Sequence, residues 1–122
     1  MADLSVDTVA RGIGIGSLSF GLLATVAPGA LRTAYGDSSP GGGALDYFGR
    51  TWGTRTAVLG ALSLMASSGE ERRRIAMLAA SMNAIDSLSA FRATGMPGVT
   101  RAMAGLTSAG FAGASMYVAM NS

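Results

Sequence analysis

Two charged residues that lie inside apolar segments are the strongest candidates for chemistry. Arg55 is the only charged residue between positions 51 and 69, and Asp86 lies well inside another apolar segment. An isolated ion is costly to place in an apolar segment, so we expect the guanidinium and the carboxylate to neutralise one another across neighbouring helices. In an up-down bundle, the start of one helix lies level with the end of the next. Either Arg55 or Arg50 is therefore long enough to reach Asp86.

Further polar side chains lie close to these two in the sequence. Trp52 shares a helical stripe with Arg55, whereas Asp46 and Arg50 form an i,i+4 pair that points nearly the opposite way. General acid/base catalysis needs one group that donates a proton and one that activates water, and two carboxylates beside an arginine are suited to this. The candidate catalytic residues are Asp86, Asp46 and Arg55. The candidate ligand contacts are Arg50, Trp52, Asn83, Tyr47 and Arg101.

The composition narrows the possible functions. Of the 122 residues 49% are hydrophobic and only 13% are charged, and the nine basic residues are all arginine. The sequence contains no cysteine and no histidine, which excludes thiolate and imidazole catalysis and metal sites built from those groups. We expect no metal and no cofactor. The arginines are dispersed rather than clustered with aromatic residues, so we expect no binding to nucleic acid.

Glycine, proline and charged residues divide the chain into four apolar segments. They predict one domain over residues 1–122 with helices at roughly 5–28, 44–67, 71–91 and 99–120. The first segment starts with acidic rather than basic residues, which favours a retained helix over a signal peptide. Short connections predict an up-down order.

The first and last segments favour a membrane. Residues 12–31 and 102–121 carry no charge, and each run is about long enough to cross ~30 Å of hydrocarbon. Gly12 and Gly16, and likewise Gly105 and Gly113 with an alanine between them, have the spacing that lets membrane helices touch through their backbones. We therefore predict an all-α, four-helix, up-down transmembrane bundle, with a possible homo-oligomer through the glycine-rich faces. The alternative is a small helical protein that buries its faces in a soluble oligomer.

The arginines also predict an orientation. Residues 72–74 are all arginine and lie at the connection between the second and third predicted helices. This connection is on the same side of the bundle as both predicted termini. The positive-inside rule places that side in the cytoplasm, which predicts a multi-pass protein of the inner membrane. Arg32, Arg92 and Arg101 on the opposite side weaken the asymmetry.

The run Gly49 to Gly60, read as GRTWGTRTAVLG, and the later NAID at 83–86 resemble an uncharacterised family of small four-helix bacterial and fungal membrane proteins. That family carries a Gly-x-Arg motif that opens helix two and an aspartate late in helix three. The matching positions here are Gly53, Arg55 and Asp86. The family's acidic residue directly after the arginine is replaced by Thr56. The resemblance implies the four-helix membrane fold but no particular activity.

Two classes of function follow. The first is a membrane protein whose Arg/Asp pocket binds a lipophilic small molecule or a lipid, or which serves as an accessory subunit of a larger complex. The second is a cofactor-independent membrane enzyme of the epoxide hydrolase or cyclase type, acting on a lipophilic substrate with aspartate as acid and base. The second class requires Asp46 to approach Asp86.

Overall fold

The computed structural model describes residues 5–36 and 43–122, and for residues 43–46 it describes the backbone only. All regular structure in these residues is helical. The helices are α1 (Val6–Val26), α2 (Pro28–Ala34), α3 (Gly43–Met65), α4 (Gly69–Arg92) and α5 (Gly98–Asn121). The all-α prediction is confirmed, and the four long helices lie close to the predicted ranges.

Side-chain caps explain where two of the long helices begin. Ser5 precedes α1 and its Oγ accepts a hydrogen bond from the backbone N–H of Thr8 at 3.1 Å. Ser68 does the same for α4, accepting from the N–H of Glu71 at 3.1 Å. Such caps satisfy N–H groups that have no partner within the helix. Both first turns also carry acidic residues, which the positive end of the helix dipole favours.

The short helix α2 was missing from the sequence prediction. The first predicted helix ends at residue 28, but Pro28 instead occupies the first turn of α2, directly after the cap residue Ala27. Proline suits that position because its missing N–H would have no helical partner there. The segment then turns at Gly36, whose φ of 83° lies in the left-handed region that glycine adopts without strain.

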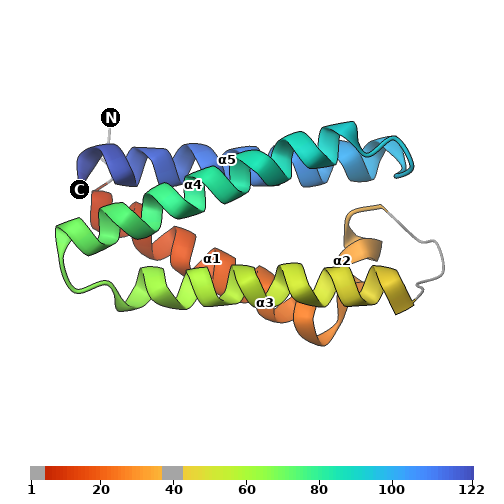
Figure 1. The fold of residues 1–122 in the computed structure, drawn as a ribbon, viewed down its shortest axis with the longest axis horizontal. Helices are drawn as coiled ribbons and strands as arrows, with labels where there is room; N and C mark the ends of the chain where they lie inside the picture. The colour runs from red at the N-terminus through yellow and green to blue at the C-terminus, as the bar shows by residue number, and fades with distance from the viewer. Residues whose placement is uncertain (1–4, 37–42) are drawn as a thin grey trace.

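The long helices form two pairs. α1 packs mainly against α3 and α4 mainly against α5, while fewer contacts join α1 to α5 and α3 to α4. Figure 1 shows the α4/α5 pair lying over the α1/α3 pair, with the chain running up and down along the long axis. The described ends of the chain and the turn between α3 and α4 lie at one end of the bundle. The turn between α4 and α5 lies at the other end.

Glycines bring α1 and α3 into backbone contact. A Cβ added at Gly53 would lie 2.6 Å from the carbonyl oxygen of Gly21, and one at Gly60 would lie 2.7 Å from that of Gly14. No larger side chain fits at these distances. The backbone contact between α1 and α3, called the seam below, therefore depends on Gly53 and Gly60. The helices are thus joined by a close approach of main chains rather than by interlocking large side chains.

The glycines predicted to mediate backbone contacts are different ones. A Cβ at Gly12 or Gly113 would meet nothing within 4 Å, and one at Gly16 would face the ring of Phe111 rather than a backbone. Gly105 likewise faces the ring of Phe91. The prediction of backbone contacts at these positions was therefore wrong within this chain, because the helices rotate other glycines toward one another.

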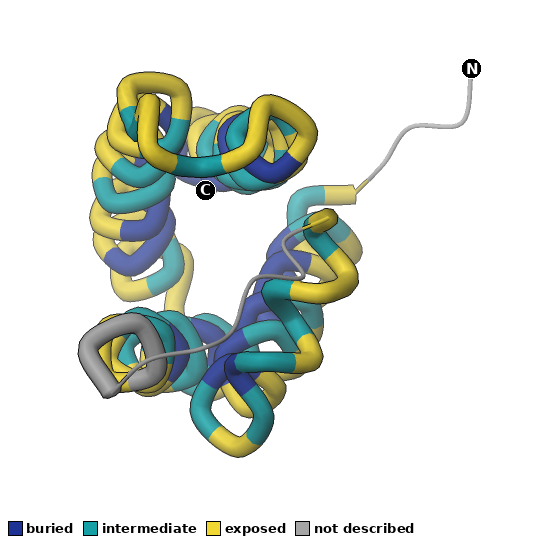
Figure 2. The backbone as a smooth tube through the Cα atoms, turned by 90° about the vertical axis from the view of Figure 1, so that its right-hand side faces the viewer, coloured by how far each residue is buried: buried dark blue, intermediate teal, exposed yellow. Residues whose placement is uncertain are grey.

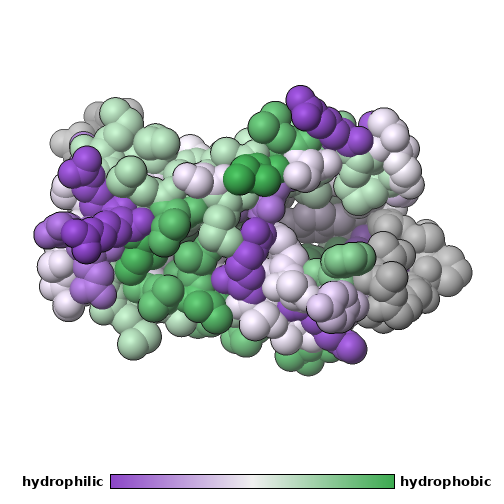
Figure 3. Space-filling model, in the orientation of Figure 1, coloured by the Kyte–Doolittle hydropathy of each residue, from purple (hydrophilic) through white to green (hydrophobic). Residues whose placement is uncertain are grey.

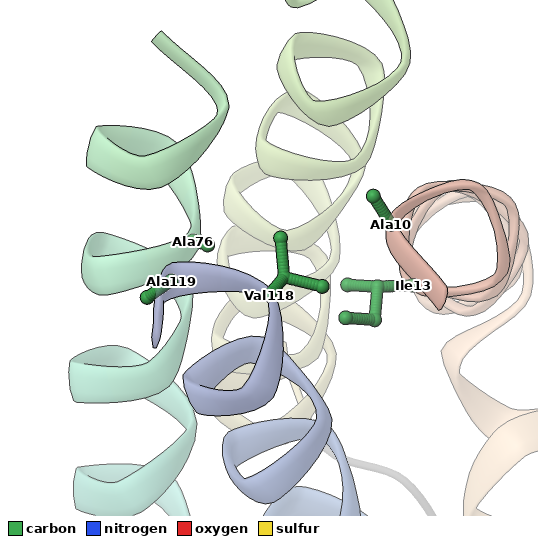
Figure 4. Close-up of a cluster of buried hydrophobic side chains, with 5 residues drawn as sticks. All are labelled: Ala10, Ile13, Ala76, Val118 and Ala119. Carbon is green, nitrogen blue, oxygen red and sulfur yellow. The ribbon is translucent and has the colours of Figure 1, made fainter. Parts of the chain in front are cut away.

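The core between the two pairs is made of small side chains. Ala10 and Ile13 of α1 meet Ala76 of α4 and Val118 and Ala119 of α5 (Figure 4). Figure 2 shows buried residues on the sides of the helices that face one another and exposed residues around the outside. Valine and isoleucine are the largest buried apolar residues among those described. Packing this tight lets four helices approach closely without a core of large side chains.

Large apolar side chains lie on the outside of the bundle instead. Exposed examples occur on all four long helices, including Val26 at 78%, Met65 at 74%, Ile85 at 62% and Leu106 at 66% of their free surface. On the face drawn in Figure 3, hydrophobic residues cover a broad area beside a hydrophilic end, with a narrow hydrophilic patch near the middle. Large apolar side chains gathered on an exposed face are typical of surfaces that pack against a membrane or another protein.

Among the described helices, α1 alone is long and apolar enough to count as a candidate membrane span. The finer prediction of four transmembrane helices is therefore not confirmed. The physical reason lies in composition: α3 contains Arg50 and Arg55, and α4 opens with five consecutive charged residues. α5 is diluted by glycine, serine and threonine.

Candidate functional site

Three side chains from α3 and α4 form the centre of the site. Nη2 of Arg55 lies 2.6 Å from Oδ2 of Asp86, which makes a hydrogen-bonded ion pair. Nε1 of Trp52 donates a second hydrogen bond to the same oxygen at 3.2 Å. The side chains of Arg55 and Asp86 keep 37% and 22% of their free surface, so the pair is partly screened from its surroundings. The predicted contact between Arg55 and Asp86 is present.

Helix geometry explains why the two donors act together. Trp52 and Arg55 are three residues apart on α3, which places them on one face of the helix. Asp86 projects from the later part of α4, at the level of the earlier part of α3, because the two helices are antiparallel (Figure 1). The ordered indole and guanidinium fix one carboxylate oxygen. Among the described contacts, none occupies the other oxygen, Oδ1.

A cavity of about 200 Å³ opens beside this carboxylate. Asp86 and Trp52 line it together with four hydroxyl-bearing residues. These are Tyr35 after α2, Ser89 on α4, and Thr107 and Ser108 on α5. Most of the remaining wall is alanine. The wall is mainly apolar, and the lining residues include one carboxylate and several hydroxyls, a pattern typical of sites for small, mostly apolar ligands.

The structure places Tyr47 and Arg50 away from this cavity. Tyr47 keeps 66% of its free surface and its ring packs edge-on against Phe48, with ring centroids 5.6 Å apart. Arg50 is exposed on α3. The side chain of Asp46 lies outside the described residues, so its distance from Asp86 stays a prediction.

Asn83 and Arg101 are also not brought to the cavity wall. Nδ2 of Asn83 donates to the carbonyl oxygen of Ala79, one turn earlier on the same helix, at 2.8 Å. Arg101 lies in the first turn of α5 and is half-buried. Of the five candidate ligand contacts, Trp52 is the one that reaches the cavity.

The hydroxyl residues of the cavity were missed as site residues. Ser108 shares a helical face with Gly105 and Ser115, and this small, mildly polar face of α5 was a usable signal. Tyr35, Ser89 and Thr107 gave no signal, because isolated hydroxyls are common in any helical sequence. Their convergence depends on how the two helix pairs pack and on the unpredicted α2.

A second charged cluster lies at the end of the bundle that holds the termini. Asp7 contacts Nε of Arg11 at 3.0 Å and Nη2 of Arg72 at 3.4 Å. The first contact lies within α1 and the second joins α1 to α4. Asp7 and Arg11 are more exposed than the pair at Asp86, whereas Arg72 keeps 29% of its free surface. The cluster serves mainly to hold the two helix ends together.

No family model, curated protein or solved structure matches the chain. The resemblance to small four-helix membrane proteins therefore stays a prediction. The function has to be argued from the site itself.

Proposed function

We propose that this chain is a small multi-pass membrane protein that binds a lipophilic molecule through a polar end placed at Asp86. The observation that carries the proposal is the carboxylate itself. Its Oδ2 is held by Trp52 and Arg55, and the residue lines a mainly apolar cavity to which several hydroxyl-bearing residues also contribute.

The membrane part of the proposal is supported by the distribution of side-chain sizes. Buried positions are occupied mainly by alanine, glycine and serine, while leucine, methionine and phenylalanine lie on the outside. This is the arrangement expected where lipid rather than water covers the surface, because small residues then provide close packing between helices. α1 supports it further, since only 33% of its most apolar window is buried inside the chain.

The orientation follows from the position of the arginines. Arg72, Arg73 and Arg74 lie at the end of the bundle where the described chain ends also lie (Figure 1). The positive-inside rule then assigns this end to the cytoplasm. The cavity at Asp86 lies toward the other end of α3 and α4.

The charge of the site selects the class of ligand. Arg55 balances Asp86, so the pair is neutral as a whole and gives a charged ligand no net attraction. Oδ1 of Asp86 is an acceptor, and the serine and threonine hydroxyls both donate and accept. We therefore expect a neutral ligand that carries a hydroxyl or an amide N–H on an apolar body.

The alternative enzymatic role has less support. Epoxide opening requires a second group that acts as acid or base. Among the described residues that line the cavity, Asp86 is the one carboxylate. The binding function is therefore the one that we propose.

The test uses the single tryptophan of the chain. Trp52 lies at the cavity wall, so its fluorescence reports on occupation of the site. The purified protein in lauryldimethylamine oxide, whose head group carries no hydroxyl and no N–H, is titrated with 1-decanol, decanoate and decane. We expect 1-decanol to change the emission saturably, and to do so at a lower concentration than the other two probes. Equal responses to all three would overturn the proposal, because the response would then reflect apolar partitioning alone.

A further inference from the structure

We propose that the ligand is a long-chain amphiphile whose tail lies in a groove between α1 and α5. This inference rests on the proposed ligand site at Asp86 and extends it. The groove has a volume of about 490 Å³ and is mainly apolar. Its walls are formed chiefly by Val9, Ile13, Leu106 and Phe111.

The groove and the cavity at Asp86 share a residue. Thr107 lines both of them. Its neighbours on α5 separate to the two sides: Ala104 and Ser108 line the cavity, whereas Leu106 and Gly110 line the groove. Thr107 therefore marks the place where the two spaces adjoin. If the polar end of a molecule lies at Asp86, the apolar space next to it is the groove, and its apolar part can lie there.

Two glycines keep the groove open. Gly12 on α1 and Gly110 on α5 both line it, and a Cβ added at either would meet nothing within 4 Å. The Phe111 wall is fixed by an edge-on contact with Phe20, with ring centroids 6.2 Å apart. Gly16 gives the Phe111 ring room, because a Cβ there would lie only 3.0 Å from it. The groove is thus an open space along α1 and α5 at the level of these glycines.

The direction of the tail follows from the ends of the groove. Thr107 lies near the middle of α5, and the groove continues along α5 to Ala114 and along α1 to Thr8. Both of these lie toward the end of the bundle that holds the described chain ends. The tail therefore runs along the bundle axis, away from Asp86. A flexible alkyl chain suits such a path because each buried methylene adds to the affinity.

The experiment compares variants that fill the groove with a matched variant outside it. Gly110→Leu and Gly12→Leu place a side chain in the groove from opposite walls. Gly113→Leu places the same side chain on α5 in equally open space, at a position that lines neither the groove nor the cavity. Each protein is titrated in the same detergent with 1-hexanol and 1-hexadecanol, with Trp52 fluorescence as the readout. Partitioning into micelles cancels when variants are compared with the same alcohol.

We expect 1-hexadecanol to bind Gly110→Leu and Gly12→Leu at least about tenfold more weakly than the wild type. Gly113→Leu should bind it as the wild type does, and 1-hexanol should bind all four proteins equally. Unchanged binding of 1-hexadecanol to both groove variants would overturn this inference while leaving the site at Asp86 intact. A wild type that does not respond to 1-hexanol would instead overturn the proposed site. Loss of a dimer in Gly110→Leu would show that a second copy of the chain fills the groove, which also overturns the inference.

Discussion

The contact of 2.6 Å between Nη2 of Arg55 and Oδ2 of Asp86 joins two helices that otherwise touch little. α3 belongs to the pair with α1, and α4 to the pair with α5. The ion pair, with the added hydrogen bond from Trp52, therefore links one helix pair to the other. The same contact that holds the pairs together also orients the carboxylate at the cavity.

Removing the charge of Asp86 should destabilise the protein. Asp86→Asn leaves the half-buried guanidinium of Arg55 without a counter-ion. We expect a loss of about 1–3 kcal/mol, between the values typical of exposed and fully buried pairs. Thermal unfolding in detergent measures it. The control is Glu70→Gln, which breaks an exposed pair with Arg74 at 2.6 Å and should cost less than about 0.5 kcal/mol. Equal, small effects of both variants would show that the Arg55–Asp86 contact adds no stability.

The backbone seam between α1 and α3 should not tolerate a single methyl group. A Cβ at Gly21 would collide with the backbone of Ala57, and one at Gly53 would lie 2.6 Å from the carbonyl oxygen of Gly21. We expect Gly21→Ala and Gly53→Ala each to lower stability by roughly 1–3 kcal/mol, because the helices must move apart. The matched control is Gly12→Ala on the open face of α1, where alanine should be neutral or stabilising by up to about 1 kcal/mol. A seam that accepts alanine without a fall in melting temperature would contradict this packing.

The orientation of the bundle can be tested by labelling, because the chain contains no cysteine. Thr94→Cys places a thiol at the exposed turn between α4 and α5, and Asn121→Cys places one at the exposed end of α5. A membrane-impermeant maleimide applied to intact bacterial cells should label Thr94→Cys at once. Asn121→Cys should react only after the cells are opened. Labelling of both positions from the same side would contradict a membrane-spanning α5.

Much of the helical framework could be predicted from the sequence. Glycine, proline and charged residues mark the ends of the long helices, since each interrupts an apolar run at a place where the backbone must turn. The approach of Arg55 to Asp86 was also predictable, because antiparallel neighbours bring the start of one helix level with the end of the next. Predicting this contact required only the order of the helices along the chain and the rise per residue of an α-helix.

The remaining features depend on tertiary packing. α1, α3 and α5 each contain several glycines, and the sequence alone could not show that Gly21 and Gly53 face one another while Gly12 faces outward. Pro28 fits the end of one helix as well as the first turn of another, so α2 was missed. Tyr35 was missed as a site residue for the same reason, because its place in the cavity depends on α2. Tyr47, expected near the ligand, is exposed and does not line the cavity.

The most direct test of the central claim removes the charge of Asp86 and the charge of Arg55 together. Arg55→Met/Asp86→Leu replaces the ion pair by apolar side chains, a change that often leaves stability unchanged or improves it. The apparent dissociation constant of 1-decanol is then measured by Trp52 fluorescence. We predict an intact melting transition with binding weakened at least about tenfold, the effect of losing one hydrogen bond to a charged group. Binding of 1-decanol as tight as in the wild type would contradict the claim that Asp86 holds the polar end of the ligand.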